Sequence, residues 1–172
     1  MQKQIIIVSG SPSAKRKLSD IIRKNCWLRE VNPKKSIREG FKLFYWDGES
    51  DVEDFVQEHL NRLNEKFDYE NRFIDENVRS FWGDDDEYKN TKSGRRYENY
   101  ALVLHGVSKN IVKYLQDEYG AFKIHVSRRE YHTVTKTDND VILLYEDDES
   151  FEGEVEKLLG VLFPKRKDLN NE

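Results

Sequence analysis

Apolar residues along the chain fall into short continuous runs, and these runs alternate with stretches in which apolar residues recur at helical spacing. A short run rich in β-branched and aromatic residues is typical of a strand buried on both faces. Five such runs are found, at residues 4–9, 41–46, 100–105, 121–127 and 140–145. Since strands that alternate with helices are joined by crossover connections, the pattern predicts an α/β fold with a five-stranded, mainly parallel sheet.

The stretches between these runs predict the helices. Apolar residues at helical spacing indicate helices at about residues 18–26, 50–82, 107–119 and 150–162. Cys26, on the apolar face of the first helix, is expected to be a core residue. Gly120 is predicted to end the third helix, and Ser150 is predicted to begin the fourth as its N-cap. Residues 83–96 show no apolar periodicity and are expected to form a surface loop.

The composition indicates one folded domain. The chain has 172 residues, of which 37% are hydrophobic and 12% aromatic, enough for a buried core. This apolar content argues against disorder even though 36% of the residues are charged. No internal repeat and no linker divides the sequence. Residues 1–163 are therefore predicted to form a single domain, with residues 164–172 as a polar C-terminal tail.

The net charge of −4 excludes an overall polycation, and basic residues occur instead in short clusters such as residues 15–17 and 128–129. Acidic runs at residues 84–87 and 146–149 offset them. Such clusters suit small anions better than a continuous nucleic-acid track, so nucleic acid is not an expected partner. The single cysteine is typical of a reducing compartment, and we expect a cytoplasmic protein. No apolar run approaches membrane-spanning length, and no membrane partner is expected.

Gly10 follows the first predicted strand, and a basic helix start follows Gly10. A strand that turns into a helix offers unpaired N–H groups and the positive end of the helix dipole, which bind phosphate. When Lys15 is aligned with the lysine of the phosphate-loop pattern G-x-x-x-x-G-K-[ST], Ser9 and Ala14 take the two glycine positions. Arg16 takes the Ser/Thr position, whose hydroxyl normally holds Mg²⁺. The sequence predicts a degenerate phosphate loop, and an ordinary turn with a solvated helix start is the alternative.

The candidate phosphate ligands are the backbone of this turn and the basic side chains that follow it. They are Gly10, Ser11, Ser13, Ala14, Lys15, Arg16 and Lys17. The spacing of the histidines predicts no metal site. Arg72 and Arg79 lie seven residues apart on a predicted helix and are candidates for a second phosphate, but ion pairs with Asp75 and Glu76 are the favoured interpretation.

Residues 5–22 have the layout of a strand, a phosphate loop and a helix, residues 100–128 that of a strand, a helix and a strand, and residues 140–155 that of a closing strand and helix. In these segments the chain resembles the P-loop nucleoside monophosphate kinases, especially the compact deoxynucleoside monophosphate kinases of phages. The resemblance implies an adenylate-kinase-like, three-layer αβα fold with strand order 2-3-1-4-5. It also implies ATP as the nucleotide, with Lys15, Arg128 and Arg129 as catalytic candidates. Lys15 would contact the phosphates, and the two arginines would close over them from a lid or, as the alternative, form a surface pair.

Two positions depart from that family. Its third strand ends in an acidic residue that helps to position Mg²⁺, whereas this strand ends at His105, and Arg16 replaces the hydroxyl. We therefore expect no bound metal and a nucleotide- or phosphate-binding pseudo-kinase with a regulatory or protein-binding role. An active (deoxy)nucleoside monophosphate kinase is the alternative. His105 is expected to face the ligand crevice, with a capping or packing role as its alternative.

Overall fold

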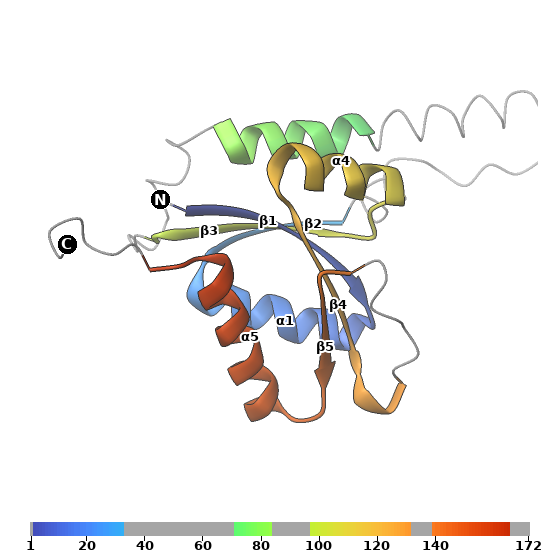
Figure 1. Ribbon diagram of the computed structural model, residues 1–172, viewed down its shortest axis with the longest axis vertical. Helices are drawn as coiled ribbons and strands as arrows, with labels where there is room; N and C mark the ends of the chain where they lie inside the picture. Colours follow the sequence, from blue (N-terminus) through green and yellow to red (C-terminus); the bar gives the residue numbers. More distant parts are fainter. Residues whose placement is uncertain (1, 33–70, 84–96, 132–138, 166–172) are drawn as a thin grey trace, which may run out of the picture. The chain divides into compact units, whose positions relative to one another are not determined.

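In the computed structural model, the described residues are 2–32, 71–83, 97–131 and 139–165 (Figure 1). The chain divides into two compact units, Met1–Val31 with Asp86–Glu172, and Asn32–Asp85. The prediction of a single domain over residues 1–163 stays a prediction.

The described part of the second unit is helical over residues 71–83, as the periodicity predicts. The buried residues of this helix recur at helical spacing and are Ile74, Val78 and Phe81. Arg79 pairs with Asp75 across one turn, with 2.9 Å between Nη2 and Oδ2, which confirms the predicted ion pair. The predicted strand at 41–46, most of the predicted loop at 83–96 and most of the predicted tail lie outside the described residues.

The first unit contains a five-stranded sheet in which every neighbouring pair is parallel. Its strands are β1 (Gln2–Gly10), β2 (Trp27–Val31), β3 (Asn99–His105), β4 (Phe122–Arg128) and β5 (Val141–Tyr145). The order across the sheet is β2-β3-β1-β4-β5. The predicted α/β class, the parallel sheet and the strand order are therefore confirmed. The central strand β1 is the most apolar, and its side chains from Ile5 to Val8 are buried.

The second strand is not the predicted one. The place next to β3 is taken by β2, Trp27–Val31, which follows the first helix directly. Among the described strands it pairs only with β3, and it carries Arg29 and Glu30. Because an edge strand keeps polar residues on its exposed side, its sequence lacks the continuous apolar run that marks a buried strand.

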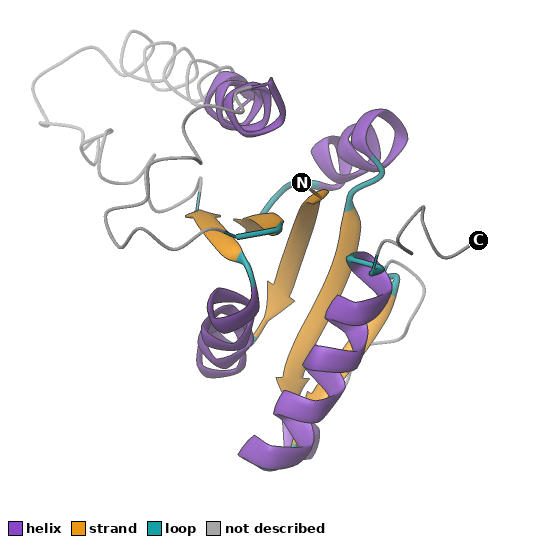
Figure 2. Cartoon of the chain, turned by 90° about the vertical axis from the view of Figure 1, so that its left-hand side faces the viewer, coloured by secondary structure: helices purple, strands orange, loops and turns teal. Residues whose placement is uncertain are grey.

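Three helices cover the two faces of the sheet. They are α1 (Pro12–Asn25), α4 (Lys109–Tyr119) and α5 (Asp148–Leu162), and a short 3₁₀ turn, η1 (Arg129–Tyr131), follows β4. Figure 1 shows α1 and α5 on one face and α4 on the other, which gives three layers, and Figure 2 shows α5 lying over the strands. The main hydrophobic core lies on the face of α1 and α5, where Leu18, Phe151 and Val155 pack against the strands.

The predicted end of α4 and the predicted burial of Cys26 are both found. Gly120 caps α4 with a left-handed conformation, φ 63°, which glycine adopts without strain. Cys26 caps the end of α1 and is buried in the core, and burial raises the pKa of its thiol to about 11. The expectation of a core cysteine is confirmed.

The structure corrects the predicted start of the last helix. Asp147, rather than Ser150, is the N-cap of α5, and its Oδ1 accepts a hydrogen bond from the Ser150 N–H at 2.8 Å. Both residue types cap helices well, but Asp147 comes first after β5, and the helix begins there. The Ser150 hydroxyl donates to Asp147 Oδ2 at 3.1 Å and supports this cap from inside the helix.

The Asp147→Ala variant is expected to lose about 1 kcal/mol of unfolding free energy, because the first turn of α5 loses its capping acceptor. Ser150→Ala keeps that acceptor and is the control, with a clearly smaller loss. Urea unfolding of the two variants at an unchanged m-value measures both losses. A loss for Ser150→Ala as large as that for Asp147→Ala would contradict the cap assignment.

Candidate functional site

Every strand is parallel to its neighbours, so all the carboxyl ends lie at one edge of the sheet. In sheets of this kind ligands bind outside that edge, at the point where connections leave to opposite faces. Here α1 leads from β1 to β2, and α4 leads from β3 to β4. Since α1 and α4 cover opposite faces (Figure 1), the switch point lies between β1 and β3.

The connection from β1 to α1 is a single residue, Ser11, because β1 runs to Gly10 and α1 begins at Pro12. Gly10 has φ 130° and lies so close to β4 that a Cβ on it would stand 1.7 Å from the carbonyl oxygen of Val126. The Ser11 N–H donates to the same oxygen at 3.2 Å. The turn is thus held against β4 and is shorter than the loop that the phosphate-loop pattern describes.

The first turn of α1 leaves two backbone donors for a ligand. Pro12 has no N–H, and the Lys15 N–H donates to the Ser11 carbonyl at 2.9 Å. The N–H groups of Ser13 and Ala14 form no backbone hydrogen bond within the described part of the chain. No acidic residue lies in this turn, so the positive end of the helix dipole is not neutralised locally. This end of α1 therefore favours an anion.

The three basic side chains at the start of α1 have different surroundings. Lys17 Nζ binds the Asp148 carboxylate and the Tyr145 hydroxyl (2.8 Å), and it lies 4.5 Å from the centre of the Tyr145 ring. The hydrogen bond to Asp148, followed by the one to Tyr145, raises the pKa of Lys17. The side chains of Lys15 and Arg16 form no hydrogen bond or ion pair with any described residue. Lys17 is tied to the start of α5, whereas Lys15 and Arg16 are available to a ligand.

A hydrogen-bonded network joins α1, β2 and β3 beside this turn. Glu30 Oε1 accepts from Ser19 Oγ at 2.5 Å and pairs with His105 Nε2 at 2.9 Å. Glu30 Oε2 accepts from Arg23 at 3.1 Å. Burial of Glu30 acts to raise its pKa, but the hydrogen bonds from Ser19 and His105, together with the nearby charge of Arg23, hold the pKa below its usual value. Lys15 lies four residues before Ser19, on the same side of α1 and one turn nearer to the strand ends.

His105 ends β3, next to β1, in register with Val8, so it lies at the predicted edge. The residue is only 8% exposed, and its Nδ1 has no hydrogen-bond partner among the residues that the structure describes. The hydroxyl of Ser11 at the neighbouring turn is likewise buried and without a hydrogen-bond partner. His105 is therefore not a packing residue alone, because Glu30 holds its Nε2 while its Nδ1 has no partner among the described residues.

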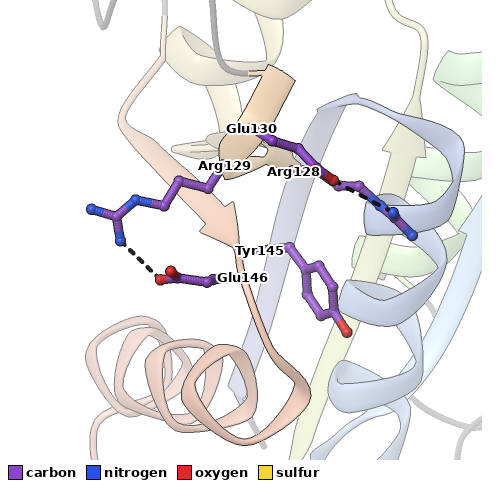
Figure 3. Close-up of a pocket in the computed structure, with 5 residues that line it drawn as sticks. All are labelled: Arg128, Arg129, Glu130, Tyr145 and Glu146. Carbon is purple, nitrogen blue, oxygen red and sulfur yellow. Dashed lines mark hydrogen bonds and ion pairs between the residues drawn. The ribbon is translucent and has the colours of Figure 1, made fainter.

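The two predicted lid arginines lie at the carboxyl end of β4 and line a surface cavity of about 570 Å³ (Figure 3). Arg129 pairs with Glu146, with 2.9 Å between Nη1 and Oε2, and Arg128 lies 3.7 Å from Glu130. Figure 3 shows the two side chains extending to opposite sides, each toward its own carboxylate. Tyr145 also lines the cavity and joins it to Lys17. The sheet edge thus carries two groups of polar residues, one at the ends of β1 and β3 and one at the ends of β4 and β5.

Glu30, Ser19 and Tyr145 were not expected at the site, since no motif in the sequence marks them. Among the described residues, no helix is long and apolar enough to cross a membrane. In the same part of the chain, no three His, Cys, Asp or Glu side chains gather as metal ligands would. No protein-family model and no curated protein matches this sequence. The candidate site therefore rests on its own geometry.

Proposed function

We propose that this protein binds a nucleotide or another phosphate-bearing ligand at the carboxyl end of β1 and does not transfer the phosphoryl group. The observation that carries the proposal is the side chain of Lys15, which pairs with none of the described residues and lies in the first turn of the helix that follows the central strand. The helix dipole and the N–H groups of Ser13 and Ala14 favour negative charge at the same place. The protein would then be a kinase-like pseudoenzyme with a regulatory or protein-binding role.

The residues around this place do not fit a bound Mg²⁺ ion. Arg16 stands where the pattern has a hydroxyl ligand, and its guanidinium repels a cation. The Glu30 carboxylate accepts hydrogen bonds on both oxygens and lies beside the charge of Arg23. Mg²⁺ requires oxygen ligands in near-octahedral geometry, and this carboxylate is already engaged. Since phosphoryl transfer depends on metal ions to neutralise developing charge, the residues support binding rather than catalysis.

An active (deoxy)nucleoside monophosphate kinase is the second candidate, and the cavity at Arg128 and Arg129 favours it. Both arginines are exposed, and exposed ion pairs of this kind contribute at most about 1 kcal/mol. A phosphate group can therefore compete with Glu130 and Glu146 for them. This candidate requires ADP formation with Mg²⁺ and at least one nucleoside monophosphate.

The Lys15→Ala variant is expected to bind ATP at least about tenfold more weakly than the wild type, because a charge-assisted contact to phosphate is lost. Lys17→Ala is the matched control: it removes the same charge two residues away, from a side chain already bound to Asp148, and should leave the affinity unchanged. Thermal unfolding with and without ATP measures the difference, since ligand at a hundred times its dissociation constant stabilises the folded state by about 2.7 kcal/mol.

Stabilisation by ATP that does not need Mg²⁺ and depends on Lys15 supports the proposal. Equal losses in Lys15→Ala and Lys17→Ala would contradict it, as would the absence of any stabilisation by nucleotides. Turnover to ADP would establish the kinase instead.

A further inference from the structure

The Glu30 carboxylate determines which nitrogen of His105 carries the proton. An ionised carboxylate accepts hydrogen bonds and cannot donate them. His105 Nε2, 2.9 Å from Glu30 Oε1, is therefore the donor, and the neutral ring carries its lone pair on Nδ1. Ser19 on α1 donates to the same oxygen at 2.5 Å and holds the carboxylate in place. The ring is thus fixed in one tautomer by residues of two other elements.

The free nitrogen is a buried acceptor without a protein partner. His105 is 8% exposed, and Nδ1 makes no hydrogen bond to any residue of the described ranges. Buried polar atoms are nearly always hydrogen-bonded, so an unpaired one points to a group that the protein does not itself supply. The two nitrogens of an imidazole face nearly opposite directions. Since Nε2 faces Glu30 on β2, Nδ1 lies on the side of the ring away from Glu30, and β1 is the strand on the other side of β3 from β2.

This side of β3 is where the phosphate is proposed to bind. His105 is in register with Val8, two residues before Gly10 and the start of α1. A lone pair selects a hydrogen-bond donor and repels the oxygens of an anion. Nδ1 is therefore suited to a neutral O–H group of the ligand rather than to its phosphate.

We infer that His105 Nδ1 accepts a hydrogen bond from a sugar hydroxyl and that the ligand of this edge is a phosphate ester with a free hydroxyl, such as a nucleoside monophosphate. The inference rests on the proposed function, because Lys15 and the start of α1 hold the phosphate. His105 is the residue that recognises the hydroxyl, and Glu30 and Ser19 are positioning residues that act through it. Inorganic phosphate would engage Lys15 but leave Nδ1 unpaired.

Two substitutions test the contributions of the two His105 nitrogens one at a time. The amide of glutamine reaches the place of Nε2, so His105→Gln keeps the contact with Glu30 and loses the acceptor at Nδ1. The amide of asparagine reaches the place of Nδ1, so His105→Asn keeps an acceptor there and loses the contact with Glu30. The probes are the four deoxynucleoside 5′-monophosphates and their 2′,3′-dideoxy analogues, which differ by one hydroxyl, with inorganic phosphate as reference. Calorimetric titration gives the ratio of affinities for each pair.

The wild type should bind at least one deoxynucleotide about 5- to 10-fold more tightly than its dideoxy analogue, as expected for one hydrogen bond to a buried acceptor. His105→Gln should lower this ratio to about one while His105→Asn retains part of it. Equal affinities in the wild type, with binding still dependent on Lys15, would overturn the inference and leave phosphate binding in place. An undiminished ratio in His105→Gln would also overturn it. Failure of every nucleotide to bind the wild type would overturn both the inference and the proposed function.

Discussion

The Gly10→Ala variant should lose at least about 3 kcal/mol of folding free energy, combining backbone strain with a steric clash. The added Cβ would stand 1.7 Å from the Val126 carbonyl oxygen and 2.7 Å from its carbon. The φ of 130° lies where side chains are strained even without a clash. Both strands are interior strands of the sheet, so neither can move aside without breaking hydrogen bonds to its other neighbour. Circular dichroism should show a melting temperature lower by roughly 6–12 °C.

Gly160→Ala is the control for this prediction. Gly160 lies in α5, and a Cβ there would meet nothing within 4 Å. Alanine has the higher helix propensity, so this variant is expected to gain about 0.5–1 kcal/mol. The same substitution should thus change stability in opposite directions at the two sites. A Gly10→Ala protein that melts with the wild type would show that the β1–α1 turn can relax away from β4.

The Glu30→Ala variant is expected to lose about 2–3 kcal/mol, because two buried donors lose their acceptor. Ser19 is 3% exposed and His105 8% exposed, and both donate to the same Glu30 oxygen. Glu30→Gln keeps an acceptor oxygen for them but loses the charge beside Arg23, so its loss should be intermediate. Chemical unfolding of the three proteins at neutral pH measures the order. Equal stability of the alanine and glutamine variants would show that the network contributes little.

The stability gap between the wild type and Glu30→Gln should depend on pH in one direction. Hydrogen bonds from Ser19 and His105 hold the pKa of Glu30 below its usual value in the folded state, despite its burial. A carboxyl of this kind stabilises the fold at pH values above the ordinary glutamate pKa of about 4.3, and the contribution is lost as pH falls through the lowered folded-state pKa. The gap should therefore be full at neutral pH and close in acid. A gap that stays undiminished at pH values well below the ordinary glutamate pKa would contradict the network.

The layout of the sheet could be predicted because its central strands leave a strong signal. Ile5 to Val8 are all buried, and a continuous β-branched run of this kind is typical of a strand covered on both faces. The strand order followed from the resemblance to the kinases, and the pairing of β1 with β3 and β4 confirms it. The kinase family itself stays a prediction.

Glu30 could not be predicted as a site residue, because its role depends on partners far along the chain. Ser19 and His105 are 11 and 75 positions away from it. A weak signal was present, since Leu28 and Glu30 lie two residues apart and so share one face of the strand, and Leu28 packs against the core. Recognising it required the knowledge that Trp27–Val31 is a strand, and an edge strand gives little periodicity.

The different roles of Lys15 and Lys17 could not be predicted for a similar reason. Both are lysines in the first turns of one basic helix, and the sequence gives them equal weight as phosphate ligands. The Lys17 ammonium is bound by Asp148, 131 positions away, and lies over the ring of Tyr145. Only the packing of α5 beside α1 decides which lysine remains available to a ligand.

The pairing of the strands also determines when the sheet can form during synthesis. β1 and β2, the first two described strands in chain order, do not pair with each other, and both pair with β3, which begins at Asn99. At ribosomal rates of roughly 5–20 residues per second, the apolar run of β1 waits several seconds for its first partner. During that time its edges are open to other chains. Nascent chains that stop before β3 therefore carry an apolar strand that lacks both of the partners it has in the finished sheet.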